Sequence, residues 1–436
     1  MRLSYRAVIA LGAIVLAAAA PLGGQARSTA GGGWTRISGP TQPGVQLGLA
    51  RTADGVLHVI WNRGATPTSI FETRFSTAGK ATGTSTVASG WDGNGGLALV
   101  TMPDKTLRLF VAGGTQPGSP AYGINTFTAP EGGGSWSLQS GVYWGGAVAN
   151  AAAVIGATLT KDGQPVTAWA GTAAEGLPPS SIPPNGYVPD QLASHVATDA
   201  ASGAVVLSGV TIAGKGGIFV QQVLPSPESS AVLPLPFGTN DWYTSLSARV
   251  GAPGVYVAYA DTKAVRLYRY GGGSKTLATG PFTSAGVCAG PDGRLWIAWG
   301  NQPDGLVVTR SNRAVSAFEP VQKLKGPGGK SDGLAFVQCE GSTGPLDLFA
   351  DIGTANGFWH THLLAQLSLN AKVAKGKVTL SVRDAGDPVA GVTIAVGGKH
   401  VRTDAKGQAT LTLRPGRYAA TATAGGYAPA SARFKV

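Results

Sequence analysis

Residues 290–300 read "GPDGRLWIAWG", and two further stretches, "TADGVLHVIWN" at 52–62 and "TKDGQPVTAWA" at 160–170, repeat the pattern. In each stretch an Asp-Gly pair is followed by five residues and then a tryptophan, which is Trp61, Trp169 or Trp299. Asp-Gly supplies the positive φ that a tight hairpin turn needs, and alternating apolar residues on both sides of it predict strands. The signature therefore predicts one hairpin used three times, with its Asp as a turn residue rather than a catalytic acid.

Weaker copies of the same unit lie between and after these three stretches, with their anchor positions at Phe110, Gly209, Tyr259 and Phe349. Together they divide residues 45–365 into seven units of about 48 residues, a period typical of propellers and solenoids. A single blade cannot bury both of its faces, so neighbouring blades must stack around an axis and the ring must close. We expect an all-β protein with a seven-bladed β-propeller. Six blades is the alternative, because the third and fourth units are the least regular.

The last unit lacks a clear outer strand. Residues 32–38 ("GGWTRIS") would supply it from the N-terminal side of the chain, and residues 365–373 ("AQLSLNAKV") are the competing segment. The Ala-rich stretch 147–157 favours a helix by propensity, but its place in the repeat predicts a strand.

The first 26 residues have the layout of a secretory signal peptide, with "MRLSYR", an apolar run and small residues up to Ala26. The apolar run has about 14 residues, fewer than the roughly 20 that a membrane span requires. We therefore expect a secreted protein, extracellular or associated with the cell envelope, with no membrane span.

After about residue 368 the period stops, and short alternating strands joined by Gly-containing turns predict a second domain. We expect a small Ig-like β-sandwich at 368–436, after a signal peptide at 1–26 and a propeller at 27–367. The second domain has 11 Lys or Arg and 3 Asp. Such a basic domain would attract an anionic wall polymer, lipid head groups or acidic glycans, or its charge would only keep it soluble.

The turn-and-aromatic signature of the repeat resembles the sialidase-like and BNR-type β-propellers of secreted bacterial proteins. The stretches "GVTIAV" (391–396) and "TDAKGQATLTLRPGRY" (403–418) resemble the carboxypeptidase regulatory-like, or Cna B-type, sandwich, and this resemblance implies a spacer or attachment role. An active sialidase needs three arginines around a substrate carboxylate. The first-blade Arg motif of that family is missing here, and Arg63, Arg249 and Arg310 are only loosely placed substitutes.

The candidate binding residues lie in segments that share one face of the expected ring, opposite the Asp-Gly turns. Trp91, Trp144 and Trp242 recur at comparable blade positions with polar residues beside them, a combination that suits the apolar faces and hydroxyl groups of sugars. The alternative is that these rings cap the core between blades. The expected ligand-binding set is Trp91, Asp92, Asn94, Trp144, Tyr187, Asp241, Trp242, Asp261 and Asp351.

Few residues point to other chemistry. Cys288 and Cys339 occupy nearly equivalent positions in the sixth and seventh units, which favours a disulfide between adjacent blades. His360 and His362 share one face of a strand, and this pattern favours the polar side of a half-buried strand over a metal-binding pair. We expect no metal, no cofactor and no nucleic-acid partner, since no motif for any of them is present.

The favoured function is a secreted, non-catalytic binding protein whose propeller face recognises a glycan or another extracellular ligand, such as a cell-wall polymer. A carbohydrate-active enzyme, hydrolase or lyase, that uses channel carboxylates is one alternative. A scaffold that binds an extracellular protein is another.

Overall fold

The computed structural model describes residues 33–39, 47–63, 68–91, 93–114, 123–139, 153–170, 195–211, 217–226, 231–234, 244–260, 263–280, 282, 284–301, 305–326, 334–352 and 357–436. Within these residues the named elements are β-strands, apart from one short 3-10 turn at Pro291–Gly293. No helix in the described part of the chain has the length and apolar character needed to cross a membrane.

Strands β1 to β26 form a series of antiparallel sheets, most of them four-stranded and built from consecutive strands. The first sheets along the chain are β2 (Gly48–Arg51), β3 (Leu57–Arg63), β4 (Thr68–Phe75) and β5 (Ala81–Trp91); β6 (Gly93–Thr101), β7 (Leu107–Gly114), β8 (Gly123–Ala129) and β9 (Ser137–Leu138); and β10 (Ala153–Leu159) with β11 (Pro165–Ala170). They are followed by β12 (His195–Thr198), β13 (Val205–Thr211), β14 (Gly217–Leu224) and β15 (Ala231–Pro234), and then by β16 (Thr244–Ala248), β17 (Val255–Ala260), β18 (Ala264–Arg269) and β19 (Ser274–Thr279). The last two are β20 (Ser284–Ala289), β21 (Leu295–Asn301), β22 (Gly305–Arg310) and β23 (Gln322–Leu324), and β24 (Leu334–Glu340), β25 (Leu346–Ile352) and β26 (Phe358–Leu363), joined by β1 (Thr35–Arg36).

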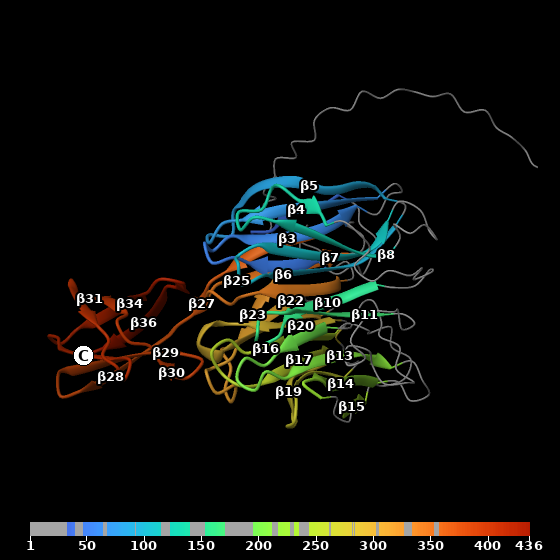
Figure 1. Cartoon of the computed structure of the whole chain (residues 1–436). Helices are drawn as coiled ribbons and strands as arrows, with labels where there is room; N and C mark the ends of the chain where they lie inside the picture. Colours follow the sequence, from blue (N-terminus) through green and yellow to red (C-terminus); the bar gives the residue numbers. More distant parts are fainter. Residues whose placement is uncertain are drawn as a thin grey trace, which may run out of the picture.

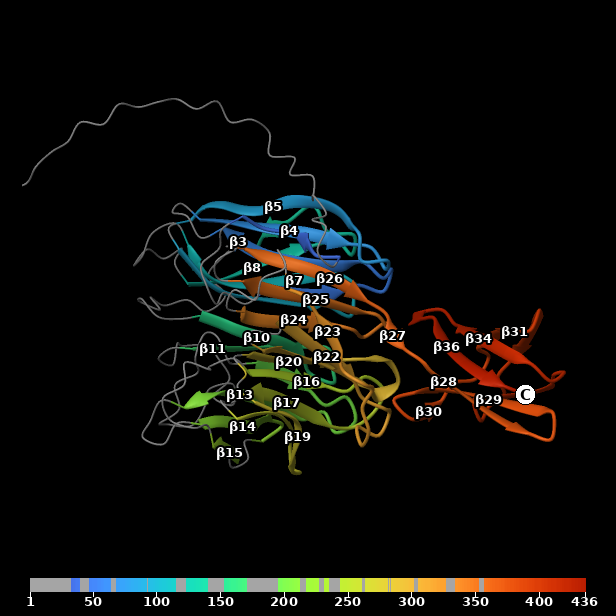
Figure 2. The same cartoon turned by 180° about the vertical axis from the view of Figure 1, so that it is seen from behind.

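The first strand of each sheet contacts the first strand of the next, in the order β2, β6, β10, β12, β16, β20, β24, and β24 contacts β2 again. The sheets therefore close into a ring around an axis lined by these strands, which is a β-propeller (Figures 1 and 2). The segment at 147–157, where propensity and repeat position disagreed, enters this ring as β10 from Ala153 onward.

The ring is closed by the N-terminal strand. Thr35 and Arg36 of β1 pair with His360 and Trp359 of β26, so β1 is the outer strand of the sheet that ends with the last repeat. The Trp34 indole donates a 2.8 Å hydrogen bond to the Lys325 carbonyl of the neighbouring sheet. Of the two segments that the sequence offered, 32–38 is confirmed, and 365–373 belongs to the C-terminal strands instead.

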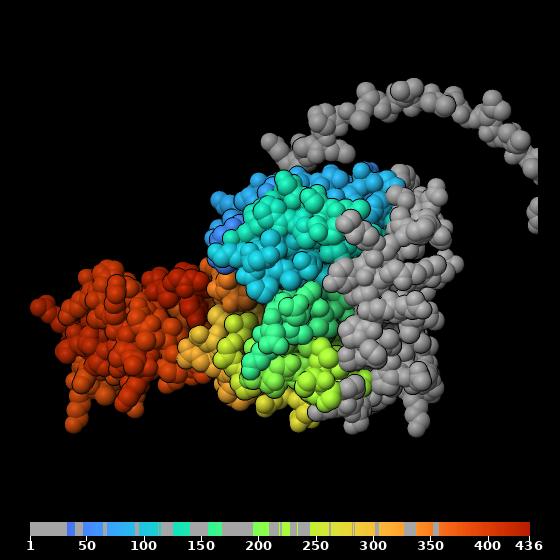
Figure 3. All heavy atoms as spheres, viewed as in Figure 1, coloured from blue at the N-terminus to red at the C-terminus, as the bar shows by residue number. Residues whose placement is uncertain are grey.

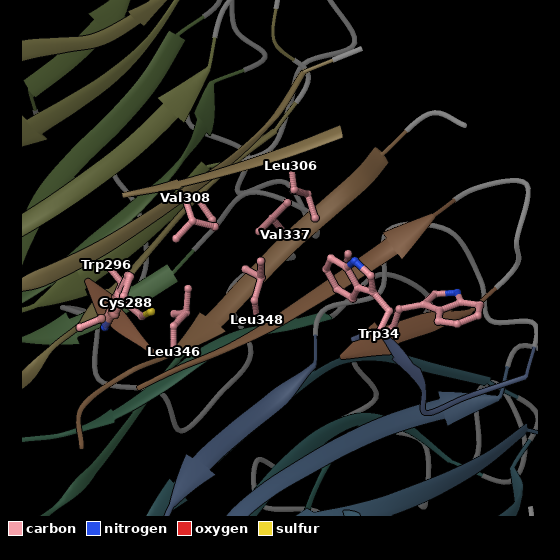
Figure 4. Close-up of a cluster of buried hydrophobic side chains, with 12 residues drawn as sticks. Trp34, Cys288, Trp296, Leu306, Val308, Val337, Leu346 and Leu348 are labelled. Carbon is pink, nitrogen blue, oxygen red and sulfur yellow. The ribbon is translucent and has the colours of Figure 1, made fainter. Parts of the chain in front are cut away.

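The aromatic anchors of the repeat are buried between sheets. Trp299 is 2% exposed, Phe110 0% and Phe349 1%, so the repeated aromatic residue supplies the packing that a sheet cannot supply alone. Figure 4 shows a further cluster between sheets, in which Cys288 of β20 and Trp296 of β21 pack with Leu346 and Leu348 of β25. The core of the ring is thus a series of inter-sheet layers.

Three innermost strands carry a glycine at the same distance from their anchor: Gly48, Gly156 and Gly286 lie 13 residues before Trp61, Trp169 and Trp299. A Cβ on Gly286 would lie 2.9 Å from the Val337 carbonyl of the next sheet, and one on Gly156 would lie 3.1 Å from the Val196 amide. These glycines therefore let adjacent sheets approach closely near the axis, where the available space is least.

The Asp-Gly pairs form the expected turns. Gly55, Gly163 and Gly293 have φ of 86°, 77° and 73°, the left-handed region that favours glycine. These turns join the two innermost strands of their sheets, so they all lie at one end of the ring.

The C-terminal strands form a separate lobe beside the ring (Figure 3). They are β27 (Ala365–Gln366), β28 (Ser368–Ala374), β29 (Lys377–Asp384), β30 (Asp387–Pro388), β31 (Thr393–Val396), β32 (Lys399–Arg402), β33 (Gln408–Thr412), β34 (Arg417–Thr423), β35 (Tyr427–Ala428) and β36 (Ala430–Lys435). One sheet holds β28, β29, β30 and β33, the other has the order β32-β31-β34-β36, and β27 pairs with β35. Val378 and Leu380 of the first sheet share a core cluster with Ile394 and Ala420 of the second.

Candidate functional site

The two ends of the ring carry different kinds of connection. At one end are the Asp-Gly turns and the equivalent turns of the weaker copies, and at the other end each second strand stops and each new sheet begins. We refer to these as the turn end and the loop end.

The turn-end aspartates act as local hydrogen-bond acceptors. Asp54 Oδ1 accepts from the Thr52 hydroxyl at 2.6 Å and from the Val56 amide at 3.1 Å. Asp104 accepts in the same way from the hydroxyl and amide of Thr106, and these hydrogen bonds hold the pKa of Asp104 below its ordinary value. This geometry fixes the turn and leaves these carboxylates in the role expected from the sequence.

The C-terminal sheets contact the ring at its turn end. Arg294 directly follows an Asp-Gly turn, and its Nη2 lies 2.8 Å from Asp387 Oδ2. Asp384 is fully buried and accepts hydrogen bonds from Arg310 Nη1 at 3.2 Å and from the Tyr427 hydroxyl at 2.8 Å. The loop end therefore faces away from this junction.

Part of the expected ligand-binding set is described. Trp91 ends β5 at 8% exposure, and its ring lies 5.7 Å from that of Phe127 in the core between the first two sheets. Asp351 lies near the end of β25 at 3% exposure. Trp91 thus occupies the core-capping position that was the alternative for these tryptophans.

The other members of that set lie outside the described residues: Asp92, Trp144, Tyr187, Asp241, Trp242 and Asp261, together with the side chain of Asn94 on β6. The signal peptide at 1–26 also lies outside them. The strand ends that flank these residues are described, namely Trp91, Gly93, Ala153, Ala170, His195, Thr244 and Ala260. All of these strand ends lie at the loop end of the ring.

The axis of the ring holds a cavity of about 190 Å³ that every innermost strand lines. Its polar side chains are His195, Ser245, Ser247 and Gln338. Gln338 accepts from the Leu47 amide at 2.7 Å, and Ser245 donates to the Val287 carbonyl at 3.1 Å, so both hydrogen-bond across sheet boundaries.

A larger cavity of about 600 Å³ opens toward the turn end. Its polar lining consists of Arg51, Thr101, Thr158, Thr160, Lys161 and Thr198. Thr158 and Thr198 share a 3.0 Å hydrogen bond between their hydroxyls. Neither cavity has an Asp or Glu among its lining residues in the described part of the chain, so the carboxylate pair that glycoside hydrolysis uses is not found there.

Two hydrogen-bonded clusters hold the buried acids Glu72 and Asp347 of the ring. Glu72 and His58 are both fully buried and lie 2.7 Å apart, and Glu72 also accepts from the Gly134 amide and the Trp136 indole. Burial alone would raise the pKa of Glu72, but these hydrogen bonds outweigh it and lower the pKa. This cluster joins the first sheet to the second. Glu72 therefore has a structural role, which explains why a carboxylate is buried at this position.

The second cluster joins the first and last sheets. Asp347 Oδ1 accepts hydrogen bonds from His360 Nε2 at 2.8 Å and from His362 Nδ1 at 2.9 Å, and Asp347 Oδ2 is paired with Arg51. Arg51 Nε lies 2.5 Å from Glu340 Oε2. The two histidines therefore bind a carboxylate, and among the described residues no group of three His, Cys, Asp or Glu is arranged to hold a metal ion.

These clusters were missed at the sequence level. Arg51 and Asp347 lie 296 residues apart, and no local pattern indicates that ring closure brings them together. The only usable signal was the alternation of His360 and His362 on one strand.

Cys288 and Cys339 are joined by a disulfide, with their Cα atoms 5.7 Å apart. They lie on β20 and β24, so the bond connects the innermost strands of adjacent sheets. It therefore links the sheet that closes the ring to the preceding sheet.

No protein-family model matches the chain, and no curated protein matches it. Solved structures do. The BP39L lectin from Burkholderia pseudomallei is 14% identical with a TM-score of 0.48, over 80% of this chain and 97% of that one. A mutant of the Aleuria aurantia lectin in complex with alpha-methyl-L-fucoside is 12% identical with a TM-score of 0.42, over 81% and 99%. The GH93 alpha-L-arabinofuranosidase of Fusarium graminearum is 11% identical with a TM-score of 0.41, over 76% and 97%.

Proposed function

We propose that this chain is a secreted, non-catalytic binding protein whose propeller recognises a glycan at the loop end of the ring. The observation that carries the proposal is the attachment of the C-terminal sheets at the turn end, through the buried contacts of Arg294 and Arg310 with Asp384 and Asp387. A lobe held at one end leaves the other end free to meet a ligand. Trp144 and Trp242, with Asp92, Asn94, Tyr187, Asp241, Asp261 and Asp351, are the proposed contacts.

The proposal includes a division of the chain. Residues 1–26 are a signal peptide, residues 27–367 a seven-bladed propeller of the sialidase-like type, and residues 368–436 an Ig-like sandwich of the carboxypeptidase regulatory-like type. The order of the innermost strands around the axis supports seven blades, and the core shared by the two C-terminal sheets supports a sandwich. The basic sandwich would then act as a spacer or as a module directed to the cell wall.

Binding is favoured over hydrolysis by the positions of four described carboxylates and by the lining of the axial cavities. Glu72 and Asp347 are buried in hydrogen-bonded clusters, Asp54 and Asp104 fix turns, and the axial cavities have no acidic residue among their described lining. Indole rings with amide and carboxylate groups beside them suit neutral sugars, which present apolar faces and hydroxyl rims.

A glycan array probed with the mature full-length chain tests the proposal. We expect retention of a defined set of glycans by the wild type and its loss in Trp144→Ala and Trp242→Ala, since stacking on an aromatic ring is lost with the ring. Trp136→Ala is the matched control, because it removes an indole whose Nε1 donates to Glu72 near the turn end. Unchanged thermal unfolding of the loop-end variants shows that they fold.

Two results would contradict the proposal. Equal glycan binding by the wild type and the loop-end variants would exclude these tryptophans as contacts. Hydrolysis of aryl glycosides by the wild type, abolished in Asp241→Asn, would make the chain an enzyme.

A further inference from the structure

The sheet β32-β31-β34-β36 has one face in the core of the C-terminal lobe and one face outward. Ile394, Val396, Ala420 and Ala422 point into the core. Since neighbouring residues along a strand point to opposite faces, the outward face carries the residues between them. We call this set the outer face: Thr393, Ala395, His400, Arg402, Arg417, Ala419, Thr421, Thr423, Ser431, Arg433 and Lys435.

The outer face is strongly cationic. Arg402, Arg417, Arg433 and Lys435 are all exposed, and the face contains no acidic residue. Arg417 pairs directly with Lys435 across β34 and β36, and Arg433 lies one face position further along β36. Like charges directly opposite each other destabilise a sheet, so stability of the fold does not explain this arrangement.

The acids of the lobe are all engaged elsewhere. Asp384 and Asp387 bind Arg294 and Arg310 of the ring, and Asp387 also accepts from the Arg313 amide at 2.8 Å. Asp404 accepts from the amides of its own turn, from Lys406 at 2.9 Å and from Gln408 at 2.8 Å. The docking of the lobe on the ring therefore neutralises arginines of the propeller and leaves the outer-face cations without acidic partners among the described residues.

The remainder of the outer face indicates what it fits. Besides these cations the outer face carries Thr393, Thr421, Ser431 and two alanines, a floor of small side chains and hydroxyl groups. The edges, β32 and β36, are three strand spacings apart, about 14 Å. The exposed large hydrophobic residues of the described chain, Leu138, Val250, Val321 and Leu364, all lie outside this face, so it has no apolar group to insert into a lipid bilayer.

We propose that the outer face binds a linear polysaccharide that carries a carboxylate on each sugar, with Arg417, Arg433 and Lys435 as the principal contacts. The arginines and the lysine bind the carboxylates, and the Thr and Ser hydroxyls hydrogen-bond to the sugars lying across the floor. The proposal deepens the wall-directed role given to the sandwich in the proposed function, and it uses no residue of the loop end.

The test measures binding of the mature full-length chain to polygalacturonate by isothermal titration, with neutral dextran as the uncharged comparison. We expect binding that weakens as salt is raised, since exposed charges are screened. The triple variant R417Q/R433Q/K435Q should bind about tenfold more weakly, since three exposed charge pairs are lost. The matched control is K372Q/K375Q/K377Q, which removes the same charge from the β28–β29 side of the lobe.

Equal weakening in both triple variants would show an effect of net charge and overturn the proposal. Tighter binding to phosphatidylglycerol vesicles than to polygalacturonate would overturn it in favour of a membrane, and so would equal binding of dextran in favour of a neutral glycan. The glycan array separates this proposal from the preceding one: R417Q/R433Q/K435Q should keep loop-end glycan binding, and Trp144→Ala should keep polygalacturonate binding.

Discussion

Arg310 and Asp384 lie 74 residues apart, and the Arg310 Nη1 donates a 3.2 Å hydrogen bond to Asp384 Oδ2 with both side chains almost completely buried. The Arg310 guanidinium also lies 5.3 Å from the centre of the Trp296 ring and 5.8 Å from that of Tyr427. One arginine of the ring is therefore enclosed by an aromatic residue of each part of the molecule. This contact sets the orientation of the C-terminal lobe, because a buried charge pair tolerates little displacement.

Asp384→Ala should loosen this junction. The substitution leaves the buried guanidinium of Arg310 without its carboxylate, and breaking a buried pair costs about 3–5 kcal/mol. We expect a lower unfolding midpoint in urea and faster proteolysis near Leu364, at the start of the lobe. Asp404→Ala, which removes only the acceptor of an exposed turn, should cost about 1 kcal/mol.

Glu319 should make the folded protein less stable as the pH rises from about 4.5 to about 8. Burial raises the pKa of Glu319 to about 8, and its hydrogen bond with Asp384 and the repulsion between the two carboxylates add to the effect, against the opposing charge of Arg310. A raised carboxyl pKa stabilises the folded state fully below about 4.5, and this contribution is lost as the pH rises to about 8.

We therefore expect the urea midpoint of the wild type, taken relative to that of Glu319→Gln, to fall between pH 5 and pH 8, since the amide of the variant stays neutral and still donates to Asp384. Glu131→Gln, outside the junction, should keep the wild-type slope. A difference between the wild-type and Glu319→Gln midpoints that stays constant over this range would contradict the assignment.

The Asp347 cluster should make the folded protein less stable as the pH falls. Burial opposes ionisation of Asp347, but hydrogen bonds from His360 and His362 outweigh it and lower the pKa of Asp347; burial also lowers the pKa of His360. Lowered pKa values stabilise the fold above the ordinary values of about 3.8 for Asp and 6.5 for His, and this stability is lost as the pH falls through the folded values.

Asp347→Asn should cost about 3–5 kcal/mol at pH 7, because Arg51 and the two histidines lose a buried partner. Its urea midpoint should then decline less than that of the wild type between pH 7 and pH 4. The matched control is Asp292→Asn, which removes an exposed partner of Arg313 and should change the free energy of unfolding at pH 7 by less than about 0.5 kcal/mol.

The Cys288–Cys339 disulfide should stabilise the ring through the unfolded chain. It closes a loop with a sequence separation of 51 residues, for which chain entropy gives about 4 kcal/mol. The double variant Cys288→Ala/Cys339→Ala should unfold at a lower urea concentration than the oxidised wild type. Reducing agent should lower the wild-type midpoint toward that of the variant and leave the variant unchanged; a midpoint unaffected by either would contradict this role.

The repeat could be predicted from the sequence because its signals are local. An Asp-Gly turn and the aromatic anchor that follows it impose φ and burial within one hairpin, and both are visible in the chain around Gly55 and Trp61. Counting strands in the last unit showed that its outer strand was missing, but the sequence left 32–38 and 365–373 as competing segments, and only the pairing of β1 with β26 decides between them. The Arg51–Asp347 pair and the docking of Asp384 on Arg310 could not be predicted, because they depend on register and ring closure over 296 and 74 residues.

The same limit of sequence-based prediction applies to the candidate ligand-binding residues. Trp91 is an aromatic residue of the kind that binds sugars. It lies at the end of a strand, however, where the neighbouring residues bury it beside Phe127. Whether a tryptophan at the end of a strand packs in the core or contacts a ligand depends on which residues cover it. Those contacts are tertiary, so the local sequence does not predict them. The glycine spacing of Gly48, Gly156 and Gly286 was a usable signal for close sheet packing, since it repeats in register with the anchors.

Gly286→Ala tests whether that spacing reflects close packing at the axis. The new Cβ would lie 2.9 Å from the Val337 carbonyl, a backbone atom that cannot move without displacing β24, and overpacking of this kind costs about 1–3 kcal/mol. Gly273→Ala is the control, because Gly273 has an ordinary φ and no atom lies within 4 Å of the place that a methyl group would take there, so alanine should be neutral or slightly stabilising. Urea denaturation of both variants, measured with the disulfide intact, compares them directly. Equal midpoints would mean that the sheets do not touch where glycine recurs, and the repeated glycine would then need another explanation.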